Sequence, residues 1–490
     1  MFSSNSKNML KQLNKDIRVL VVRYKNHPNH WSILQKKVHP VDKALSHFDD
    51  FYKQVYDKQW LSIRDGLLGT QKYVAVINTF GDSEESMAKL ELGGAINMRT
   101  LFKLEKQHIE DKLAKNKRFS RLKQILDLDK LSEQQEENSA PENDGTNTET
   151  SGINAREFSL ENSLDNAEYD TKRLVDIKNV LSTEILHEFV PATKIKGRED
   201  FILESSHYKL YDNNSRFNVQ VEKEYDIDFP EHLNVYCYEA ESESTFQSAK
   251  KSVAGVLNYY LMDGGSVLPV LALNLKPGHR MLDMCAAPGG KSLLALQSLY
   301  PECIVSNDVS QSRLNRIDSV FRQFLYDFDE RWLNTGRIRL TKFDGRFVVE
   351  DNFDRILVDV PCTTDRHSLH NNDNNIFKPS RIKERLQIPK LQQQLLFNAL
   401  KLVRKGGIVV YSTCSLSPIQ NDGVVHMVLK QIWEETNMEV IVKDLSPALL
   451  QTKHVFKFAD KKLLKYGHLV LPCLAQNYGP TYFCKLQRVK

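Results

Sequence analysis

Short apolar strands alternate with helices through the second half of the sequence, and this alternation most constrains the fold. Residues 279–285 (HRMLDMC) read as a strand, 286–291 (AAPGGK) as a glycine turn and 292–300 (SLLALQSLY) as a helix. The same order recurs downstream, with another helix over 312–325 and strands over 303–310, 338–345, 353–362 and 406–414. Strands that alternate with helices predict a parallel sheet covered on both faces. We therefore expect an α/β fold in which ligands bind beyond the carboxyl ends of the strands.

Carboxylates and cysteines follow these strands at the edge where a ligand would bind. Asp359 and Cys362 end one strand (VDVPC), and Cys414 ends the next (YSTC). Asp308 and Asp344 end two earlier strands, the ones expected over 303–310 and 338–345. Taken singly, each aspartate reads as a helix cap or a turn residue. Taken together they favour a nucleoside-containing ligand, because Asp308, about twenty residues past the glycine turn, can accept hydrogen bonds from both ribose hydroxyls.

The glycine turn in MLDMCAAPGGKS leads from a strand into a helix and exposes backbone N–H groups to a ligand. Its Gly289 and Gly290 match neither the dinucleotide fingerprint G-x-G-x-x-G nor the phosphate loop G-x-x-x-x-G-K-[ST]. Phosphate binding is therefore disfavoured, and S-adenosyl-L-methionine, which has no phosphate, fits the series of aspartates better. Asp344 is expected near the adenine amino group, where Gly345 would give the ring space. An ordinary glycine turn is the alternative that two glycines alone leave open.

The cysteines indicate catalytic or buried thiols instead of a disulfide framework. They number seven, are widely scattered and include no C-x-x-C pair that would begin a zinc site, so we expect no metal. Cys362 and Cys414 stand at strand ends beside polar residues, which favours reactive thiols. Cys285, inside the glycine turn, is expected to pack with its backbone facing the cofactor. The other four are expected in the core: Cys237, Cys303, Cys473 and Cys484.

Four regions are expected along the chain. Residues 1–35 are basic and poor in acids, as in a mitochondrial transit segment, with a frayed basic tail as the alternative. Residues 36–130 space their apolar residues as helices do and carry a basic run that either contacts RNA or is simply solvated. Residues 131–165 are predicted to be an acidic disordered linker, since 131–154 holds six acidic residues and no Lys or Arg. Residues 166–490 are predicted to be the catalytic domain.

Overall composition excludes few functions. The formal net charge is only +4 over 490 residues, so any nucleic-acid binding would depend on local clusters of Lys and Arg. A hydrophobic content of 41% is enough to build a large core. No apolar run approaches the roughly 20 residues of a membrane-spanning helix, so we expect no membrane segment.

Four motifs carry a specific family resemblance: DMCAAPGGKS, NDVSQSRL, DVPCTTDR and YSTCSLSPIQND. Together they resemble the signature motifs of the Sun-domain (Fmu-like) RNA cytosine-5 methyltransferases. Within that family, LHEFVPATKIKG, YYLMDGGSVLPVLAL, CTTDRHSLHNNDNNIFKPSR and GPTYFCKLQ resemble the mitochondrial ribosomal-RNA members. The resemblance runs from about residue 186 to the C-terminus, and the acidic segment 131–154 departs from the family pattern.

The resemblance implies a class I S-adenosylmethionine-dependent methyltransferase fold. This is a Rossmann-like, mostly parallel seven-stranded sheet with a late antiparallel strand, here within 480–489, and a helical N-terminal extension. It also implies that Cys414 attacks carbon 6 of cytosine, that Cys362 helps to release the product and that Asp359 hydrogen-bonds the cytosine edge. A thiolate is needed because carbon 5 is too electron-poor to attack a methyl sulfonium directly, and the base must be unpaired or flipped out. The implied cofactor pocket consists of Cys285, Gly289, Gly290, Lys291, Asp308, Arg313, Asp344, Gly345 and Asp359.

The implied function is formation of 5-methylcytosine in mitochondrial small-subunit ribosomal RNA, in the matrix and in support of mitoribosome assembly. The implied partners are ribosomal RNA, assembly intermediates of the mitoribosome and a helical-repeat protein of the mitochondrial transcription terminator family. The alternatives are an assembly scaffold whose methylation is dispensable and a methyltransferase that acts on transfer RNA. A DNA cytosine methyltransferase is disfavoured, because those enzymes use the Pro-Cys cysteine as nucleophile and lack the second one.

Overall fold

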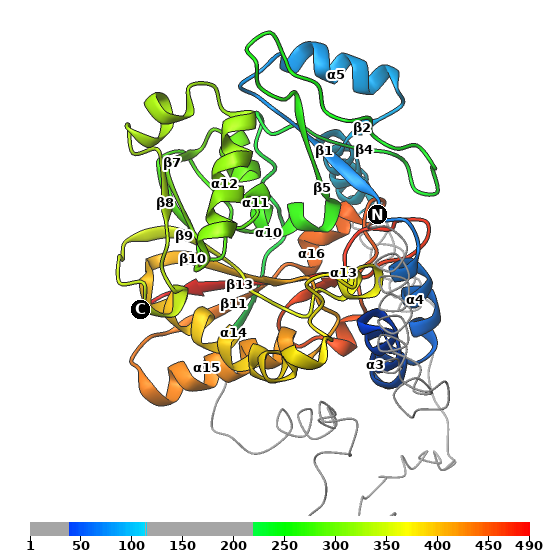
Figure 1. The fold of residues 1–490 in the computed structure, drawn as a ribbon, viewed down its shortest axis with the longest axis vertical. Coiled ribbons are helices and arrows are strands. Elements are labelled where there is room, and N and C mark those ends of the chain that lie inside the picture. The colour runs from blue at the N-terminus through cyan, green and yellow to red at the C-terminus, as the bar shows by residue number, and fades with distance from the viewer. Residues whose placement is uncertain (1–38, 113, 115–218) are drawn as a thin grey trace, which may run out of the picture. The chain divides into compact units, whose positions relative to one another are not determined.

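The computed structural model describes residues 39–112, 114 and 219–490, and its largest element is a nine-stranded sheet (Figure 1). The strand order is β3-β11-β13-β10-β9-β6-β7-β8, with β12 paired to β13. The strands are β3 (Val221–Lys223), β6 (His279–Asp283), β7 (Pro301–Asn307), β8 (Ile338–Thr341), β9 (Phe353–Asp359), β10 (Val403–Thr413), β11 (Val440–Asp444), β12 (His468–Val470) and β13 (Thr481–Arg488).

Seven of these strands form the sheet that the sequence predicts. Strands β8, β7, β6, β9 and β10 run parallel, and β13 lies antiparallel between β10 and β11. Each of the five strands expected before the C-terminal one is present, and β13 is the expected late antiparallel strand. Strand β9 is buried over most of its length, as its continuous apolar run requires in a sheet covered on both faces. The prediction of a mostly parallel α/β fold is confirmed, with β3 and β12 as additions.

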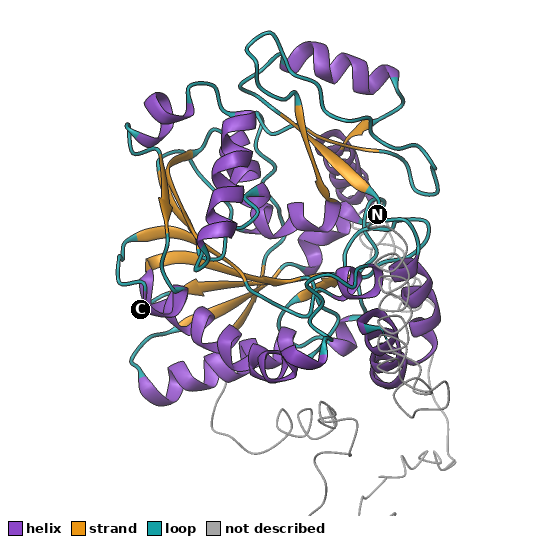
Figure 2. Ribbon diagram, viewed as in Figure 1, coloured by secondary structure: helices purple, strands orange, loops and turns teal. Residues whose placement is uncertain are grey.

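Helices cover both faces of this sheet (Figure 2). On one face lie α10 (Val267–Ala272), α11 (Gly290–Gln297) and α12 (Gln311–Phe324), and on the other α14 (Ile382–Leu402) and α15 (Val424–Glu435) (Figure 1). From β6 the chain moves outward through β7 to β8, whereas from β9 it moves in the opposite direction to β10. The strand order therefore reverses between β6 and β9, and a crevice at their carboxyl ends is where such sheets bind ligands.

The N-terminal part of the described chain contributes helices and also strands. The helices are α3 (Pro40–Tyr56), α4 (Trp60–Leu68) and α5 (Ser83–Leu92), which lie within the region predicted to be helical. The same region holds β1 (Tyr73–Ile77) and β2 (Ile96–Asn97), which the sequence reading did not predict. They pair with β4 (Val235–Cys237) and β5 (Tyr259–Asp263) in a second sheet of order β2-β4-β1-β5. The described residues 39–102 and 219–490 thus belong to one compact unit.

Several sequence predictions fall outside the described residues. They are the transit segment 1–35, the acidic linker 131–165 and the three boundaries that separate the four predicted regions. These stay predictions. In the described ranges no helix has both the length and the apolar character needed to cross a membrane.

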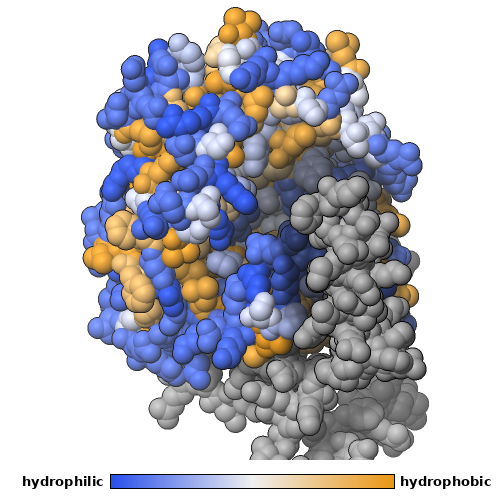
Figure 3. All heavy atoms as spheres, in the orientation of Figure 1, coloured by the Kyte–Doolittle hydropathy of each residue, from blue (hydrophilic) through white to orange (hydrophobic). Residues whose placement is uncertain are grey.

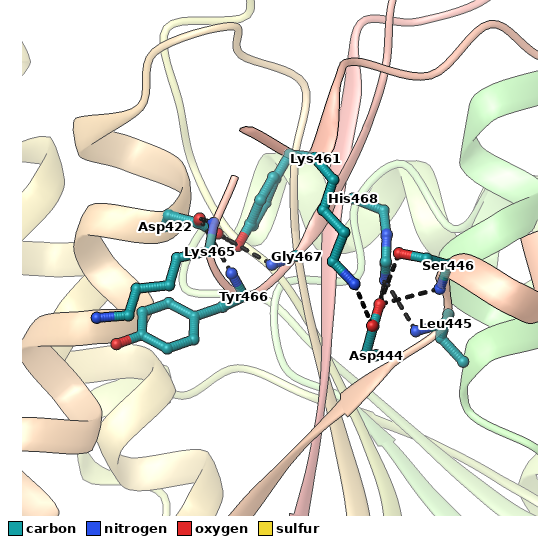
Figure 4. Close-up of polar contacts among 10 residues, drawn as sticks. Asp422, Asp444, Leu445, Ser446, Lys461, Lys465, Tyr466, Gly467 and His468 are labelled. Atoms are coloured by element: carbon teal, nitrogen blue, oxygen red, sulfur yellow. Dashed lines mark hydrogen bonds and ion pairs between the residues drawn. The ribbon is translucent and has the colours of Figure 1, made fainter. Parts of the chain in front are cut away.

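Two buried aspartates tie the C-terminal loops to the sheet (Figure 4). Asp422, from the SPIQND motif, accepts hydrogen bonds from the backbone N–H groups of residues 465–467 and, at 2.5 Å, from the Tyr482 hydroxyl. Asp444, at the end of β11, accepts from the Ser446 hydroxyl and forms an ion pair with Lys461. The motif aspartate therefore holds the fold together and does not face the ligand cavities described below.

His468 makes the stability of this region depend on pH. Burial lowers the pKa of His468 from its ordinary 6.5 to about 4, with Asp444 acting in the opposite direction and Lys461 in the same one. Its Nε2 accepts the Leu445 N–H at 3.0 Å, so protonation also breaks a hydrogen bond. The unfolded chain takes up this proton below about pH 6.5 and the folded protein only near pH 4. Stability is therefore fully present above pH 6.5 and is lost as the pH falls toward 4.

Replacing His468 should weaken this pH dependence. In the His468→Gln variant the amide oxygen can still accept the Leu445 N–H, but no proton is taken up. We expect the loss of unfolding free energy between pH 7 and pH 5 to shrink by about 2 kcal/mol, measured by urea unfolding at both pH values. The exposed His232→Gln variant serves as the control. An unchanged pH dependence in His468→Gln would show that other groups govern acid stability.

Candidate active site

Cys362 and Cys414 lie side by side at the ends of two neighbouring strands. Strands β9 and β10 are parallel, with Asp359 opposite Ser412. The loops that follow bring the two Sγ atoms to within 3.0 Å of each other. The Cys414 backbone N–H also donates to Cys362 Sγ at 3.4 Å. Two residues 52 positions apart in the sequence thus form one pair of thiols.

The two thiols differ in their access to solvent. Cys362 is buried, whereas Cys414 is exposed and faces the cavity described below. The hydrogen bond with Cys362 raises the pKa of the Cys414 thiol well above its ordinary value. Desolvation by the surrounding protein and the negative charge of Asp359 also raise this pKa, whereas the positive charge of Lys291 lowers it. Cys414 therefore holds its proton in this arrangement and must lose it before it can act as a nucleophile.

Asp359 lies beside the cysteine pair and links it to the glycine turn. It is the last residue of β9, and its two carboxylate oxygens accept from Lys291 Nζ at 2.7 Å and from Ser412 Oγ at 2.8 Å. Burial alone would lower the pKa of Lys291, but the charge and hydrogen bond of Asp359 outweigh it and raise that pKa. A charged ammonium and a carboxylate therefore stand together next to the thiols, and the carboxylate keeps lone pairs for a ligand.

The buried Asp365 supports both cysteine loops. It begins α13 (Asp365–His370), and its oxygens accept from Thr363 Oγ1 at 2.5 Å and from the Leu416 N–H at 2.7 Å. A third hydrogen bond comes from the hydroxyl of Tyr52 on α3, also at 2.7 Å. Burial raises the pKa of Asp365 although these hydrogen bonds oppose the rise. One carboxyl group therefore connects the Cys362 loop, the Cys414 loop and a helix more than 300 residues earlier.

Two residues of the SPIQND motif complete this support. Gln420 is paired with Thr363, accepting its N–H at 3.1 Å and donating to its Oγ1 at 3.1 Å. Asn421 accepts from Thr413 Oγ1 at 2.6 Å and donates to the Ser415 carbonyl at 2.9 Å. The residues on each side of Cys414 are therefore fixed by one side chain. Such a network restricts where the sulfur can move and favours a single geometry.

The glycine turn lies at the carboxyl end of β6 and opens α11. Gly289 has φ of +107°, in the left-handed region that favours glycine. Gly290 begins the helix, where a Cβ would lie 2.7 Å from the Tyr260 ring. Ala287 and Pro288, just before the glycines, line the cavity. The turn therefore needs glycine for its own conformation and packing, and it presents neighbouring backbone to the ligand.

Asp308 follows β7 and retains an acceptor suited to a ribose. It is buried, and its Oδ1 accepts the Ser310 N–H at 3.0 Å. Its Oδ2 accepts no hydrogen bond from the described residues and stands 3.3 Å from Arg313 Nε in an ion pair. Arg313 also donates to the Ala287 carbonyl, which joins the helix after β7 to the glycine turn. A buried carboxylate with an open lone pair fits the hydroxyls of a nucleoside.

Asp344 lies after β8, where Arg346 holds its carboxylate. Arg346 donates to it from Nε at 3.0 Å and from a terminal nitrogen at 2.6 Å, and this pairing lowers the pKa of Asp344. An adenine amino group would have to share these oxygens with Arg346. Gly345 is buried, and a Cβ there would lie 2.7 Å from a Leu395 methyl group and 2.8 Å from Met284. Glycine at this position therefore permits close packing under the predicted adenine site.

Asp283 and Cys285 lie at the carboxyl end of β6, before the glycine turn, and neither lines the cavity described below. Cys285 is half-buried, does not line the cavity, and burial raises the pKa of its thiol. Asp283, the last residue of β6, accepts from Ser292 Oγ at 2.6 Å, while its Oδ1 has no hydrogen-bond partner among the described residues. Burial raises the pKa of Asp283 to about 7. Sequence reasoning missed Asp283, although its place at a strand end is the signal that singled out Asp308.

A cavity of about 1020 Å³ joins the cysteine pair to the glycine turn. Its charged lining is mainly cationic, with six basic side chains against the two acids Asp359 and Glu384: Lys291, Arg313, Arg316, Arg346, Arg381 and Lys390. Hydrophilic residues cover much of the face seen in Figure 3, and apolar ones form patches among them. The excess of basic groups is local, since the whole chain has a net charge of only +4. A cavity with this positive charge suits the phosphates of a nucleic acid, one base of which could reach the two thiols.

Comparisons with known proteins agree with this geometry. A family model described as 16S rRNA methyltransferase RsmB/F matches residues 270–459. The chain is 44% identical over 267 residues to the Mus musculus protein named 5-cytosine rRNA methyltransferase NSUN4. The matched residues cover 54% of this chain and 68% of that protein. It is 33% identical over 460 residues to the Caenorhabditis elegans 5-cytosine rRNA methyltransferase nsun-4, which spans 92% of each chain.

The chain belongs to this family of RNA cytosine-5 methyltransferases. The Mus musculus protein named tRNA (cytosine(34)-C(5))-methyltransferase, mitochondrial, is a further relative. It is 33% identical over 255 residues, which are 51% of this chain and 70% of that protein. The resemblance expected from the four motifs is therefore confirmed.

The structure of this RNA methyltransferase places five of the eleven predicted site residues in the lining of one cavity. Cys362, Cys414, Asp359, Lys291 and Arg313 line the same cavity. The other six predicted residues are not part of this lining: Cys285, Gly289, Gly290, Asp308, Asp344 and Gly345. The basic residues Arg316, Arg346, Arg381 and Lys390 and the supporting Asp365 were not predicted. Charge alone does not single them out in a sequence with 67 Lys and Arg residues.

Proposed function

We propose that this methyltransferase makes 5-methylcytosine in mitochondrial small-subunit ribosomal RNA. The observation that carries the proposal is the pair of cysteine sulfurs 3.0 Å apart, beside Asp359 and inside a basic cavity. Methylation at carbon 5 needs a nucleophile that adds to the ring and a group that later assists its departure. A pair of thiols with unequal exposure can divide these two tasks.

Cys414 is the nucleophile in this proposal. Its exposed sulfur, as a thiolate, forms a bond to carbon 6 of the target cytosine, and the electron pair of the 5,6 double bond moves toward carbon 5. A proton reaches ring nitrogen 3 as the sulfur adds, and the Asp359 carboxylate accepts hydrogen bonds from that N–H and from the exocyclic amine, where charge develops. Lys291 and Ser412 hold this carboxylate in place through hydrogen bonds of 2.7 and 2.8 Å. Attack at carbon 6 makes carbon 5 nucleophilic.

Cys362 acts after the methyl group has been transferred. The proton on carbon 5 must pass to a base, its electron pair must re-form the 5,6 double bond, and the bond between Cys414 and carbon 6 must break so that Cys414 leaves as a thiolate. Cys362 Sγ lies 3.0 Å from the departing sulfur, and Cys362 is buried whereas Cys414 is exposed. We assign it to this release step, so that without it the covalent RNA–protein bond persists.

S-adenosyl-L-methionine is the proposed methyl donor, and the residues at the crevice fit it. When bound, it supplies an electrophilic methyl group on a sulfonium sulfur. Asp308, with an open acceptor on Oδ2, would hold the ribose, and Asp344 with Gly345 would lie at the adenine. The backbone around Gly289 and the Lys291 side chain would lie near the methionine part, next to Asp359. These assignments are supported by the donor set and by the absence of any phosphate-binding glycine pattern in the sequence.

Ribosomal RNA is the proposed substrate because relatives that match nearly the whole chain carry that activity in their names. Transfer RNA is the second candidate, favoured by the relative named as a mitochondrial tRNA methyltransferase. The name of that relative and the basic N-terminal segment also support a mitochondrial location, which we place in the matrix. A helical-repeat protein of the mitochondrial transcription terminator family and assembly intermediates of the mitoribosome are proposed as partners.

Depletion of the protein followed by bisulfite sequencing of mitochondrial RNA tests this function. We expect one cytosine of the small-subunit ribosomal RNA to lose its methyl group, to regain it with the wild-type chain or Cys303→Ala, and to stay unmethylated with Cys414→Ala. Loss of a methyl group from transfer RNA alone would favour the second candidate. Restoration of mitoribosome assembly by Cys414→Ala would show that assembly needs the protein but not its methylation.

A further inference from the structure

A second cavity meets the first at the proposed nucleophile. It has a volume of about 640 Å³, within the range of about 300–1,000 Å³ that small-molecule sites occupy. The two cavities share five lining residues: Ser266, Thr364, His367, Cys414 and Thr481. Asp359 and Lys291 line only the first cavity. The second, which we call the Tyr73 groove, therefore leads away from Cys414 on the side that does not hold the cofactor residues.

The Tyr73 groove differs from the first cavity in charge. Among its described lining residues, Arg366 is the one side chain with a permanent positive charge. That guanidinium is buried and already donates to the backbone carbonyls of Gly66 and Gly479 and to the Asn477 side chain at 2.7–3.0 Å. It is not available to a phosphate. The rest of the lining consists of one carboxylate, Asp263, and of histidine, neutral polar and apolar residues, so the groove suits a base better than the RNA backbone.

Aromatic surface is present at the wall of this groove. Tyr73 begins β1 and is 48% exposed, although the four residues that follow it in the strand are buried. His367, on α13, is exposed and lines both cavities. Unpaired bases stack on exposed tyrosine and histidine rings in proteins that bind single-stranded RNA. A side chain at the start of an otherwise buried strand is thus available for such a contact.

The walls of the groove are held by hydrogen bonds within the protein. Gln71 donates to Asp263 Oδ1 at 2.9 Å, and the Gly479 N–H donates to the same oxygen at 2.8 Å. His370 on α13 is bonded to the Leu67 carbonyl on α4 at 2.8 Å. These contacts join α4, β5, α13 and the loop before β13 around one opening. The groove is therefore formed before any ligand binds, which lowers the cost of ordering on binding.

We infer that the Tyr73 groove binds the unpaired nucleotide next to the target cytosine, with its base stacked on Tyr73. This rests on the proposed function, because it takes Cys414 as the residue that meets the target base. A base at Cys414 and Asp359 fills the junction with the first cavity, and the basic lining there receives phosphates. The neighbouring nucleotide must leave the junction, and the groove is the opening that starts from Cys414 without reaching the cofactor residues.

The test uses unmethylated single-stranded RNA fragments that contain the target cytosine of the ribosomal RNA. The fragments are either intact or have an abasic nucleotide immediately before or after that cytosine. In the wild-type protein we expect one of the two abasic fragments to raise KM and the Kd for RNA roughly tenfold, as the loss of one stacked base does. Tyr73→Ala should raise both values by a similar factor on the intact fragment, with kcat nearly unchanged. It should also lose the response to the abasic nucleotide, whereas Tyr73→Phe should behave as the wild type.

Tyr326→Ala is the matched control, because Tyr326 is 47% exposed and lines neither cavity. The inference is overturned if Tyr73→Ala matches this control, or if the abasic penalty persists in Tyr73→Ala. Since Tyr73→Phe keeps the ring, its normal response beside a failing Tyr73→Ala separates stacking from damage to the fold. RNA binding is measured with methylation, so an inactive wild-type protein that still shows the abasic effect would contradict the proposed function and support the groove.

Discussion

The Cys362→Ala protein, incubated with RNA and S-adenosylmethionine, should accumulate an RNA adduct that survives denaturing electrophoresis, whereas Cys414→Ala should form none. Cys414 supplies the sulfur that bonds to carbon 6, so its loss abolishes both the adduct and methylation. Without Cys362, attack and methyl transfer proceed but release stalls. The 3.0 Å separation of the two sulfurs makes this division of roles testable by single substitutions.

The control for this pair is Cys303→Ala, a cysteine of β7 that does not line the cavity and that is half-buried, not in the core as the sequence predicted. It should methylate RNA at the wild-type rate and show no stable adduct. The opposite pattern, with an adduct in Cys414→Ala and none in Cys362→Ala, would mean that the roles are reversed and that the DNA-type mechanism applies. Equal loss of activity without an adduct in both variants would contradict a separate release step.

Asp308→Ala should bind S-adenosylmethionine roughly 10- to 150-fold more weakly in isothermal titration calorimetry. Hydrogen bonds to a charged group contribute about 1.5–3 kcal/mol, and every 1.4 kcal/mol is a factor of ten in Kd. The Asp308 carboxylate is buried and keeps one oxygen without a hydrogen bond from the described chain, so ribose hydroxyls would be its natural donors. Loss of the carboxylate leaves those hydroxyls unpaired in a buried site.

Asp318→Ala provides the comparison for this measurement. Asp318 lies on α12, where its partner is Arg322 on the exposed helix surface, so its loss should not change the affinity for S-adenosylmethionine. The thermal stability of both variants is measured first, because Asp308 is also paired with Arg313. Unchanged affinity in a folded Asp308→Ala protein would remove Asp308 from the cofactor site.

Local sequence patterns were enough to place the strands and the residues at their ends. A strand buried on both faces needs a continuous apolar run, and Asp359, Cys362 and Cys414 stood out because they interrupt or end such runs. Parallel strands present these ends at one edge, so neighbours in the sheet become neighbours in the site. In the parallel pair β9–β10, for example, Asp359 lies opposite Ser412, which brings Cys362 and Cys414 to the same edge of the sheet.

Contacts between distant segments were beyond the reach of this reading. The hydrogen bond from Tyr52 to Asp365 joins residues 313 positions apart, and the spacing of residues in neither segment predicts it. Strand β1 was read as part of a helical region because the segments around it are amphipathic helices, and its pairing with β5 depends on tertiary packing. The basic lining of the cavity also comes from several elements, and only the fold selects Arg346 and Arg381 from many similar side chains.

The most direct test of the central claim is nucleoside mass spectrometry of ribosomal RNA transcripts incubated with the protein and S-adenosylmethionine that carries a deuterated methyl group. The account predicts that the label enters 5-methylcytidine with the wild-type protein, and that Cys414→Ala transfers none. Label in a different nucleoside, or 5-methylcytidine formed by Cys414→Ala, would contradict methylation of cytosine carbon 5 through a bond to Cys414.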